Sequence, residues 1–145
     1  RNLSRQGLDV TLIADSAVAS VMKEVDMVIV GADVVTARGS LINKIGTSAI
    51  AIIAYEEKTP FYSACELWKF DPATKWGAER SIEQRNPKEI ISDVKSAELR
   101  ELEKVKILNP AFDITESKYI SGYITEEGIV SAQDFARIAE KALGN

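Results

Sequence analysis

The sequence predicts an α/β fold in which a parallel sheet carries helices on both faces. Three apolar runs of strand length occur at 9–15, 26–33 and 60–67. Segments 16–25 and 46–58 lie between them and space their apolar residues as a helix does. Strands that alternate with helices over short links favour βαβ units with right-handed crossovers, so we expect a Rossmann-like arrangement.

The first helix and second strand have distinct signatures. Segment 16–25 places Val18, Val21, Met22 and Val25 at helical spacing, and Ser16 suits the N-cap position. Segment 26–33, "DMVIVGAD", is continuously apolar before its final aspartate. Such a run is typical of a strand that is buried on both faces of a parallel sheet.

The second helix, 46–58, is rich in alanine, which favours close packing on a sheet, and Thr47 or Ser48 is expected to cap it. A long polar excursion follows at 69–90, with a helical turn expected near Glu83. The segment "SAELRELEKVKILNP" predicts a short helix and then a strand at 105–108.

The two ends of the chain also carry helix signals. Residues 1–7 read as the tail of a helix that Gly7 ends, which suggests a piece of a longer protein. A strand is expected at 119–125, and a helix at 131–144 that begins with a Ser131–Asp134 capping box.

Composition limits the classes of function. The chain has 145 residues, 46% of them hydrophobic, which suits one globular domain. A net charge of −4 argues against a general nucleic-acid surface, and no apolar run is long enough to span a membrane. Histidine is absent, which excludes Ser-His-Asp and Cys-His catalysis within the chain and disfavours a zinc site. The single cysteine, Cys65, favours a reducing, cytoplasmic location.

Ligands of open parallel sheets bind at the carboxyl ends of the strands. Those ends carry Asp15, Asp33 and Cys65-Glu66, and Lys69 follows closely. "NKIGT" places Asn43 and Lys44 just before a helix start, where free N–H groups attract anions. We therefore expect a crevice that binds a phosphate beside Asp33.

Each of these residues also has a simpler structural interpretation. Asp33 fits a turn residue or a helix cap, and Asn43-Lys44 fits an exposed loop. Lys69 fits a solvated side chain, and Cys65 a small buried hydrophobe. A dinucleotide site is disfavoured because no strand is followed by G-x-G-x-x-G.

Four segments together carry a family resemblance. "GADVVTARGSLINKIGT", "PFYSACELWKF", "NPAFDIT" and "YITEEGIV" resemble the superfamily of translation initiation factor 2B alpha, beta and delta subunits, ribose-1,5-bisphosphate isomerase and methylthioribose-1-phosphate isomerase. The resemblance covers the whole chain but only the C-terminal half of a typical member. It implies that residues 1–145 form a single C-terminal ligand-binding domain, without the helical N-terminal half.

The resemblance implies a role for four residues. Asp33 corresponds to the acid of the sugar-phosphate isomerases, and Asn43 and Lys44 correspond to a pair that contacts substrate. Lys69, in "LWKF", resembles a further phosphate ligand of the ribose-bisphosphate branch. The catalytic cysteine of the isomerases lies upstream of this segment, and Cys65 does not match it.

Two functions follow as hypotheses. The first is the C-terminal domain of an archaeal-type ribose-1,5-bisphosphate isomerase, inactive as this fragment alone and without cofactor or metal. The second is a non-catalytic regulatory subunit that binds a sugar phosphate or nucleotide and partner subunits. Methylthioribose-1-phosphate isomerase is a third branch. The resemblance also implies a homo-oligomer, a dimer or a hexamer, with a sugar phosphate as ligand. The charge and the apolar run lengths described above predict no direct nucleic-acid or membrane partner.

Overall fold

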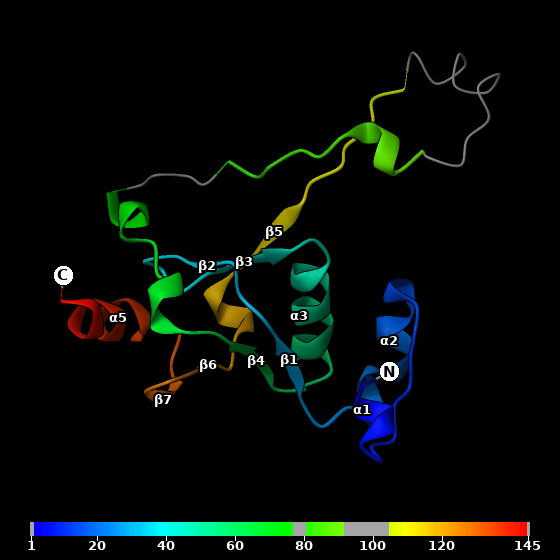
Figure 1. Cartoon of the computed structure of the whole chain (residues 1–145), viewed down its shortest axis with the longest axis horizontal. Helices are drawn as coiled ribbons and strands as arrows, with labels where there is room; N and C mark the ends of the chain where they lie inside the picture. The colour runs from blue at the N-terminus through cyan, green and yellow to red at the C-terminus, as the bar shows by residue number, and fades with distance from the viewer. Residues whose placement is uncertain (1, 77–80, 92–104, 145) are drawn as a thin grey trace.

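A computed structural model of the chain describes residues 2–76, 81–91 and 105–144. The fold is α/β, as predicted, and its main sheet has the strand order β1-β4-β6-β7 (Figure 1). The first three strands run parallel, and β7 turns back antiparallel to β6. These strands are β1 (Val28–Val30), β4 (Phe61–Ala64), β6 (Gly122–Thr125) and β7 (Gly128–Val130).

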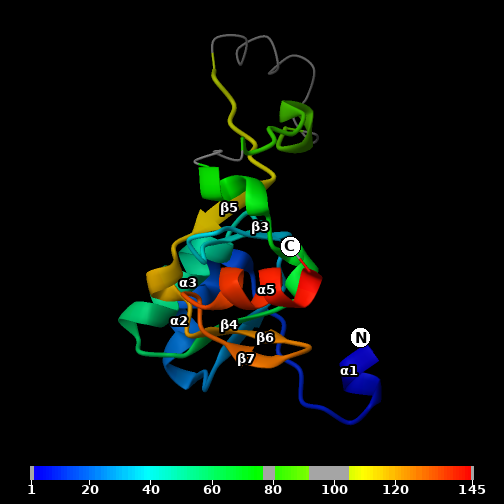
Figure 2. The same ribbon diagram turned by 90° about the vertical axis from the view of Figure 1, so that its left-hand side faces the viewer.

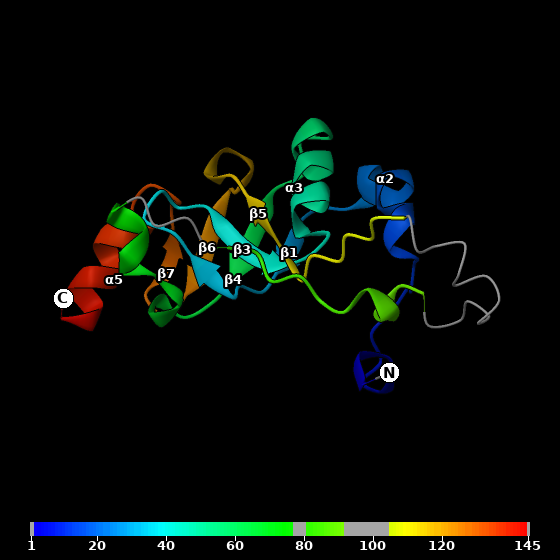
Figure 3. The same cartoon turned by 90° about the horizontal axis from the view of Figure 1, so that it is seen from above.

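Helices flank this sheet on two sides. In Figures 1 and 3, α2 and α3 lie on one side of β4 and β6, and α5 lies on the other. The ring of Tyr123 in β6 packs on the ring of Phe135 in α5, with 4.7 Å between the ring centroids, and both side chains are fully buried. The α-helices are α1 (Asn2–Arg5), α2 (Val18–Val21), α3 (Thr47–Glu56) and α5 (Phe135–Leu143).

A second, antiparallel sheet interrupts the expected βαβ order. It has the order β2-β3-β5, from β2 (Val34–Val35), β3 (Leu41–Lys44) and β5 (Phe112–Thr115). The chain leaves β1, forms the β2–β3 hairpin and only then enters α3. Gly39 forms the turn of this hairpin with a φ of +71°, which favours glycine. Because β2, β3 and β5 pair antiparallel, the fold combines a mainly parallel sheet with an antiparallel one.

The strand predicted at 9–15 is wrong, because residues 8–14 form no strand and Asp15 begins a 3-10 turn. Leu12 is 95% exposed there. As a result β1 is an edge strand and Ile29 is 54% exposed, so the prediction that this run is buried on both faces is also wrong. An apolar pattern indicates an extended conformation, but pairing depends on a neighbouring edge that a pattern does not specify.

The helix predicted at 16–25 is broken into short turns. The 3-10 turns Asp15–Ala17 and Met22–Glu24 flank the single turn of α2. Met22, 2% exposed, anchors this segment in the core. Ala14 rather than Ser16 precedes the first turn, so the predicted serine cap is wrong.

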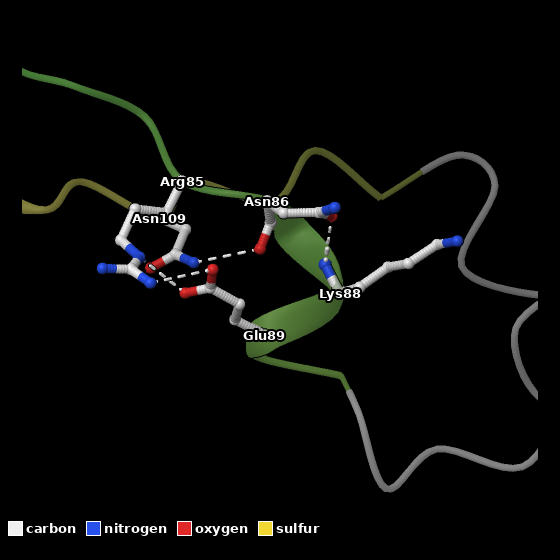
Figure 4. Close-up of polar contacts among 5 residues, drawn as sticks. All are labelled: Arg85, Asn86, Lys88, Glu89 and Asn109. Atoms are coloured by element: carbon white, nitrogen blue, oxygen red, sulfur yellow. Dashed lines mark hydrogen bonds and ion pairs between the residues drawn. The ribbon is translucent and has the colours of Figure 1, made fainter.

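The polar excursion forms an antiparallel arm, defined here as residues 81–91 and 105–110. It projects away from the two sheets (Figures 1 and 2). A backbone hydrogen bond of 2.8 Å, from Arg85 N to the Asn109 carbonyl, joins the two segments of the arm. Figure 4 shows Arg85 forming a two-pronged ion pair with Glu89, and Asn109 donating to the carbonyl of Asn86.

The arm corrects two expectations. Glu83 lies in extended chain, and the only helical turn described in the arm is the 3-10 turn Pro87–Glu89. Residues 105–108 form no strand, because β5 begins later, at Phe112. The short helix predicted just before them falls at 96–104, outside the described residues.

Other local predictions are confirmed. The Ser131 hydroxyl accepts a hydrogen bond from Asp134 N at 3.1 Å, which is one half of the predicted capping box, but α5 itself begins later than predicted, at Phe135. Gly7 has a φ of +81° after α1.

Within the described ranges, no helix has both the length and the apolar character needed to cross a membrane. The remaining 3-10 turns are Leu67–Lys69, Pro72–Trp76 and Ser117–Tyr119.

Candidate functional site

Asp33 lies between the end of β1 and the start of β2. Its backbone N–H donates to the carbonyl of Ile42 at 3.1 Å, which fixes it against β3. Its side chain is exposed, and with Ser81 and Glu83 of the arm it lines a cavity of about 230 Å³. The apolar run 26–33 favours an apolar, water-poor setting for Asp33, but the described chain does not provide it, because β1 is an edge strand.

Asn43 and Lys44 end β3, directly before α3. The Asn43 side-chain amide donates to the Thr47 hydroxyl at 3.1 Å, and that hydroxyl donates to the Lys44 carbonyl at 2.6 Å. The Lys44 side chain is exposed and lines a second cavity, of about 200 Å³, together with Asp15. The structure thus brings Asn43 and Lys44 together in one hydrogen-bonded turn.

The cap of α3 comes from a distant residue rather than from Thr47 or Ser48. Gly46 is the N-cap, with a φ of +102° and no side chain to serve as a cap. Asp113 of β5 accepts from the backbone N–H of Gly46 at 2.8 Å and of Ser48 at 3.1 Å. Two N–H groups of the predicted phosphate-binding helix start are therefore bound by a carboxylate of the same chain.

Lys69 lies in the turn that runs along the other edge of β2. Val35 pairs with Leu41 of β3 and also forms a parallel bridge with Phe70, and Asp71 N donates to the Val35 carbonyl at 3.0 Å. Lys69 therefore lies beside the strand that follows Asp33. Its ammonium rests 4.2 Å from the centroid of the Trp68 ring.

Cys65 lies at the carboxyl end of β4, between the strand and Lys69. Burial raises the pKa of its thiol to about 11, and the nearby charge of Glu126 acts in the same direction. Glu126 itself accepts a hydrogen bond from Leu67 N at 3.0 Å, so it fixes the turn that carries Lys69. A thiol with a raised pKa is a poor nucleophile at neutral pH.

The arm also contributes to the site, which sequence reasoning missed. The pKa of the Glu89 carboxyl is lowered, chiefly by its hydrogen bonds with Arg85 and to a smaller extent by the charge of Lys44. The only signals in the sequence were the "NPAFDIT" segment, which contains Asp113, and the length of the excursion. Neither signal specifies that Asp113 binds the start of α3, or that Ser81 and Glu83 of the arm lie beside Asp33, because these residues are far apart in the chain.

These residues lie around β2 but in separate surroundings, because Asp33 lines one cavity and Lys44 lines another. Lys44 ends β3, which pairs with one side of β2; Lys69 is next to Phe70, which bridges to the other side; and Asp33 precedes β2. A carboxyl can transfer a proton, and ammonium groups on two sides can bind two anionic groups of one ligand. No group of three His, Cys, Asp or Glu residues that could hold a metal ion occurs among the described residues.

Comparison with known proteins gives similar sequences and folds. The ribose 1,5-bisphosphate isomerase of Methanocaldococcus jannaschii is 48% identical over 145 residues, which cover 99% of this chain and 45% of that protein. The structure of 5-methylthioribose 1-phosphate isomerase from Pyrococcus horikoshii OT3 aligns with a TM-score of 0.80 and 40% identity, over 98% of this chain and 39% of that one. The delta subunit of the translation initiation factor eIF-2B from A. fulgidus aligns with a TM-score of 0.78 and 36% identity, over 99% and 42%.

The chain spans less than half the length of these relatives. The family model of the initiation factor 2 subunit family matches residues 1–132, which is most of the chain. That match and the identity with full-length relatives agree with the resemblance drawn from the four sequence segments. The chain therefore belongs to the initiation factor 2 subunit family.

Proposed function

We propose that the full-length protein that contains this chain is a sugar-phosphate isomerase that converts ribose-1,5-bisphosphate to ribulose-1,5-bisphosphate. In this reaction Asp33 is the general acid, and Asn43, Lys44 and Lys69 bind the substrate. The proposal is supported by the 48% identity with the isomerase of Methanocaldococcus jannaschii and by the placement of these residues.

The chemistry explains why an acid is needed. A furanose with a phosphate on C1 cannot open to a free aldehyde while the phosphate stays attached. When the bond between C1 and the ring oxygen breaks, that oxygen must take up a proton and becomes a hydroxyl group. In this proposal Asp33 delivers the proton, and general acid catalysis of this kind contributes roughly 10²–10⁴-fold to a rate. Because Asp33 is exposed here, the bound substrate and the rest of the full-length protein have to shield it from water.

One observation favours a substrate with two phosphates. The segments on the two sides of β2 each carry a lysine, Lys44 at the end of β3 and Lys69 next to Phe70. Ribose-1,5-bisphosphate carries phosphates at both ends of the sugar, whereas methylthioribose-1-phosphate carries one phosphate and an uncharged thioether. The second lysine therefore supports the bisphosphate as substrate.

A regulatory subunit is the second candidate. Its support is the fold shared with the delta subunit of eIF-2B from A. fulgidus over 99% of this chain. Such a protein would bind a sugar phosphate through Lys44 and Lys69 without converting it. We further propose that the full-length protein self-associates, which sedimentation velocity at micromolar concentration tests.

The deciding experiment measures turnover of ribose-1,5-bisphosphate and of methylthioribose-1-phosphate by the full-length protein. We expect turnover of the bisphosphate, and Lys69→Met should raise its KM at least tenfold. Lys141→Met, at an exposed lysine in α5, is the matched control and should leave KM unchanged. Binding of the bisphosphate without turnover would favour the regulatory subunit. Preference for methylthioribose-1-phosphate would refute the role given to Lys69.

A further inference from the structure

The start of α3 is bound by a charged residue from a different sheet strand. Most helices cap their first N–H groups with a nearby serine, threonine or aspartate. Here Asp113, 67 residues away, accepts from Gly46 N with one oxygen at 2.8 Å and from Ser48 N with both oxygens at 3.1 Å. Its carboxylate occupies the position at which a helix start usually binds a phosphate.

The same strand also fixes the turn that carries the substrate-binding residues. In the β3–β5 register Asn43 lies opposite Asp113, and Ile45 N donates to the Ala111 carbonyl at 3.1 Å. Together with the two capping contacts, these bonds hold the segment from β3 into α3 on both sides of Lys44. The Lys44 side chain itself stays exposed.

A phosphate at this helix start would meet two obstacles. The N–H groups of Gly46 and Ser48 already donate to Asp113, and a second anion beside that carboxylate would be repelled. The ammonium group of Lys44 is the nearby cation that remains open to solvent. An anion is therefore directed away from the helix axis and toward the lysine side chain.

We propose that Asp113 is a positioning residue of the candidate site: it closes the start of α3 to phosphate and thereby directs the substrate phosphate to Lys44. This inference rests on the proposed binding role of Lys44. Asp113 does not touch the reacting atoms. It determines where one end of the sugar lies, and therefore which sugar atom faces Asp33.

The first test uses inorganic phosphate and the full-length protein, and needs no turnover. Isothermal titration should show that Lys44→Ala weakens phosphate binding at least tenfold. Asp113→Ala frees two N–H groups, so the double variant Lys44→Ala/Asp113→Ala should regain binding at least tenfold over Lys44→Ala alone. Asp134→Ala, which removes an aspartate at the start of α5, is the control and should not restore it when combined with Lys44→Ala.

The second test separates positioning from helix capping. Asp113→Asn keeps the shape but loses the charge, and Asp113→Glu keeps the charge. If phosphate binds at the wrong place, kcat for ribose-1,5-bisphosphate should fall at least tenfold in Asp113→Ala and in Asp113→Asn. KM of these two variants should stay unchanged or fall. Asp113→Glu should recover part of kcat. An error of about 1 Å in placement is enough for such a loss. A role limited to stability would lower the unfolding temperature and leave kcat of the folded enzyme unchanged.

The two proposals fail in different ways. If phosphate binding does not return in the double variant, Asp113 does not close the helix start, whatever the turnover of the wild type. If phosphate binding returns as expected but the wild type converts neither sugar, the inference on Asp113 holds and the isomerase proposal fails. Should Asp113→Ala not fold, the double variant Lys44→Ala/Asp113→Ser provides the phosphate comparison, because the shorter side chain also leaves the two N–H groups free.

Discussion

The hydroxyl of Tyr123 donates a hydrogen bond of 2.9 Å to the carbonyl of Gly39, across 84 residues of chain. Tyr123 belongs to the central strand β6 and is fully buried, whereas Gly39 forms the turn between β2 and β3. The contact ties the hairpin to the parallel sheet. The segments before and after that turn carry Asp33, Asn43 and Lys44, so the placement of the candidate site depends on it.

Tyr123→Phe should lower the free energy of unfolding by about 1–3 kcal/mol. The substitution keeps the ring but leaves the buried Gly39 carbonyl without its donor, and an unpaired buried acceptor carries that penalty. Urea unfolding of the chain measures the change. Tyr55→Phe, at a side chain that is 57% exposed, is the control and should have little effect.

Gly39→Ala should destabilise the chain far more than Gly128→Ala. Both glycines have a positive φ, +71° and +99°, so both variants carry backbone strain. At Gly39 a Cβ atom would also overlap the carbonyl of Ala132, whose carbon lies 2.7 Å away, whereas nothing lies within 4 Å at Gly128. We expect about 3 kcal/mol or more for Gly39→Ala and about 1 kcal/mol for Gly128→Ala. Equal losses in urea unfolding would contradict the close packing of this turn on Ala132.

Asp33→Asn in the full-length protein should reduce kcat by roughly 10²–10⁴-fold, because the amide cannot deliver a proton to the ring oxygen. Substrate affinity should change much less, because the lysines that bind the phosphates remain. Steady-state turnover and equilibrium binding of ribose-1,5-bisphosphate measure the two effects. Asp26→Asn removes an exposed carboxylate before the opposite end of β1 and should leave kcat unchanged. Near-normal turnover of Asp33→Asn would return Asp33 to the role of a turn residue.

Cys65 should react slowly with iodoacetamide at neutral pH. Its pKa is raised from 9.0 to about 11, chiefly by burial, so the folded chain keeps the unreactive thiol form until the pH passes well above 9. The alkylation rate should therefore keep rising between pH 9 and 11, whereas in urea it should level off just above pH 9. A rate for the folded chain that levels off at the same pH as the unfolded chain would show that the thiol is not shielded.

Lys58→Gly should stabilise the chain by about 0.5–1 kcal/mol. Lys58 follows the C-cap of α3 with a φ of 61°, and Thr59 N donates to the Ala54 carbonyl at 2.8 Å, a helix ending that favours glycine. Thermal unfolding measures the gain. Glu57→Gly, one residue earlier and with a φ of −85°, should destabilise instead, because no strain is relieved there.

Several elements follow from local sequence because their causes are local. The helix at 47–56 and the cap formed by Ser131 and Asp134 depend on residues within a few positions of each other. Asn43 and Lys44 share a turn with Thr47 for the same reason. Family membership also follows from the sequence, because long motifs with fixed spacing identify relatives without any knowledge of contacts.

Tertiary structure decided the features that join distant segments. Sequence by itself determined that apolar runs become extended chain and that Asp33 follows one of them. Only the fold decided that residues 8–14 pair with no strand, that β2 and β3 reverse into a hairpin, and that Asp113 caps α3. The physical reason is that a strand or a helix start needs a hydrogen-bond partner, and that partner can come from any part of the chain that folding brings close.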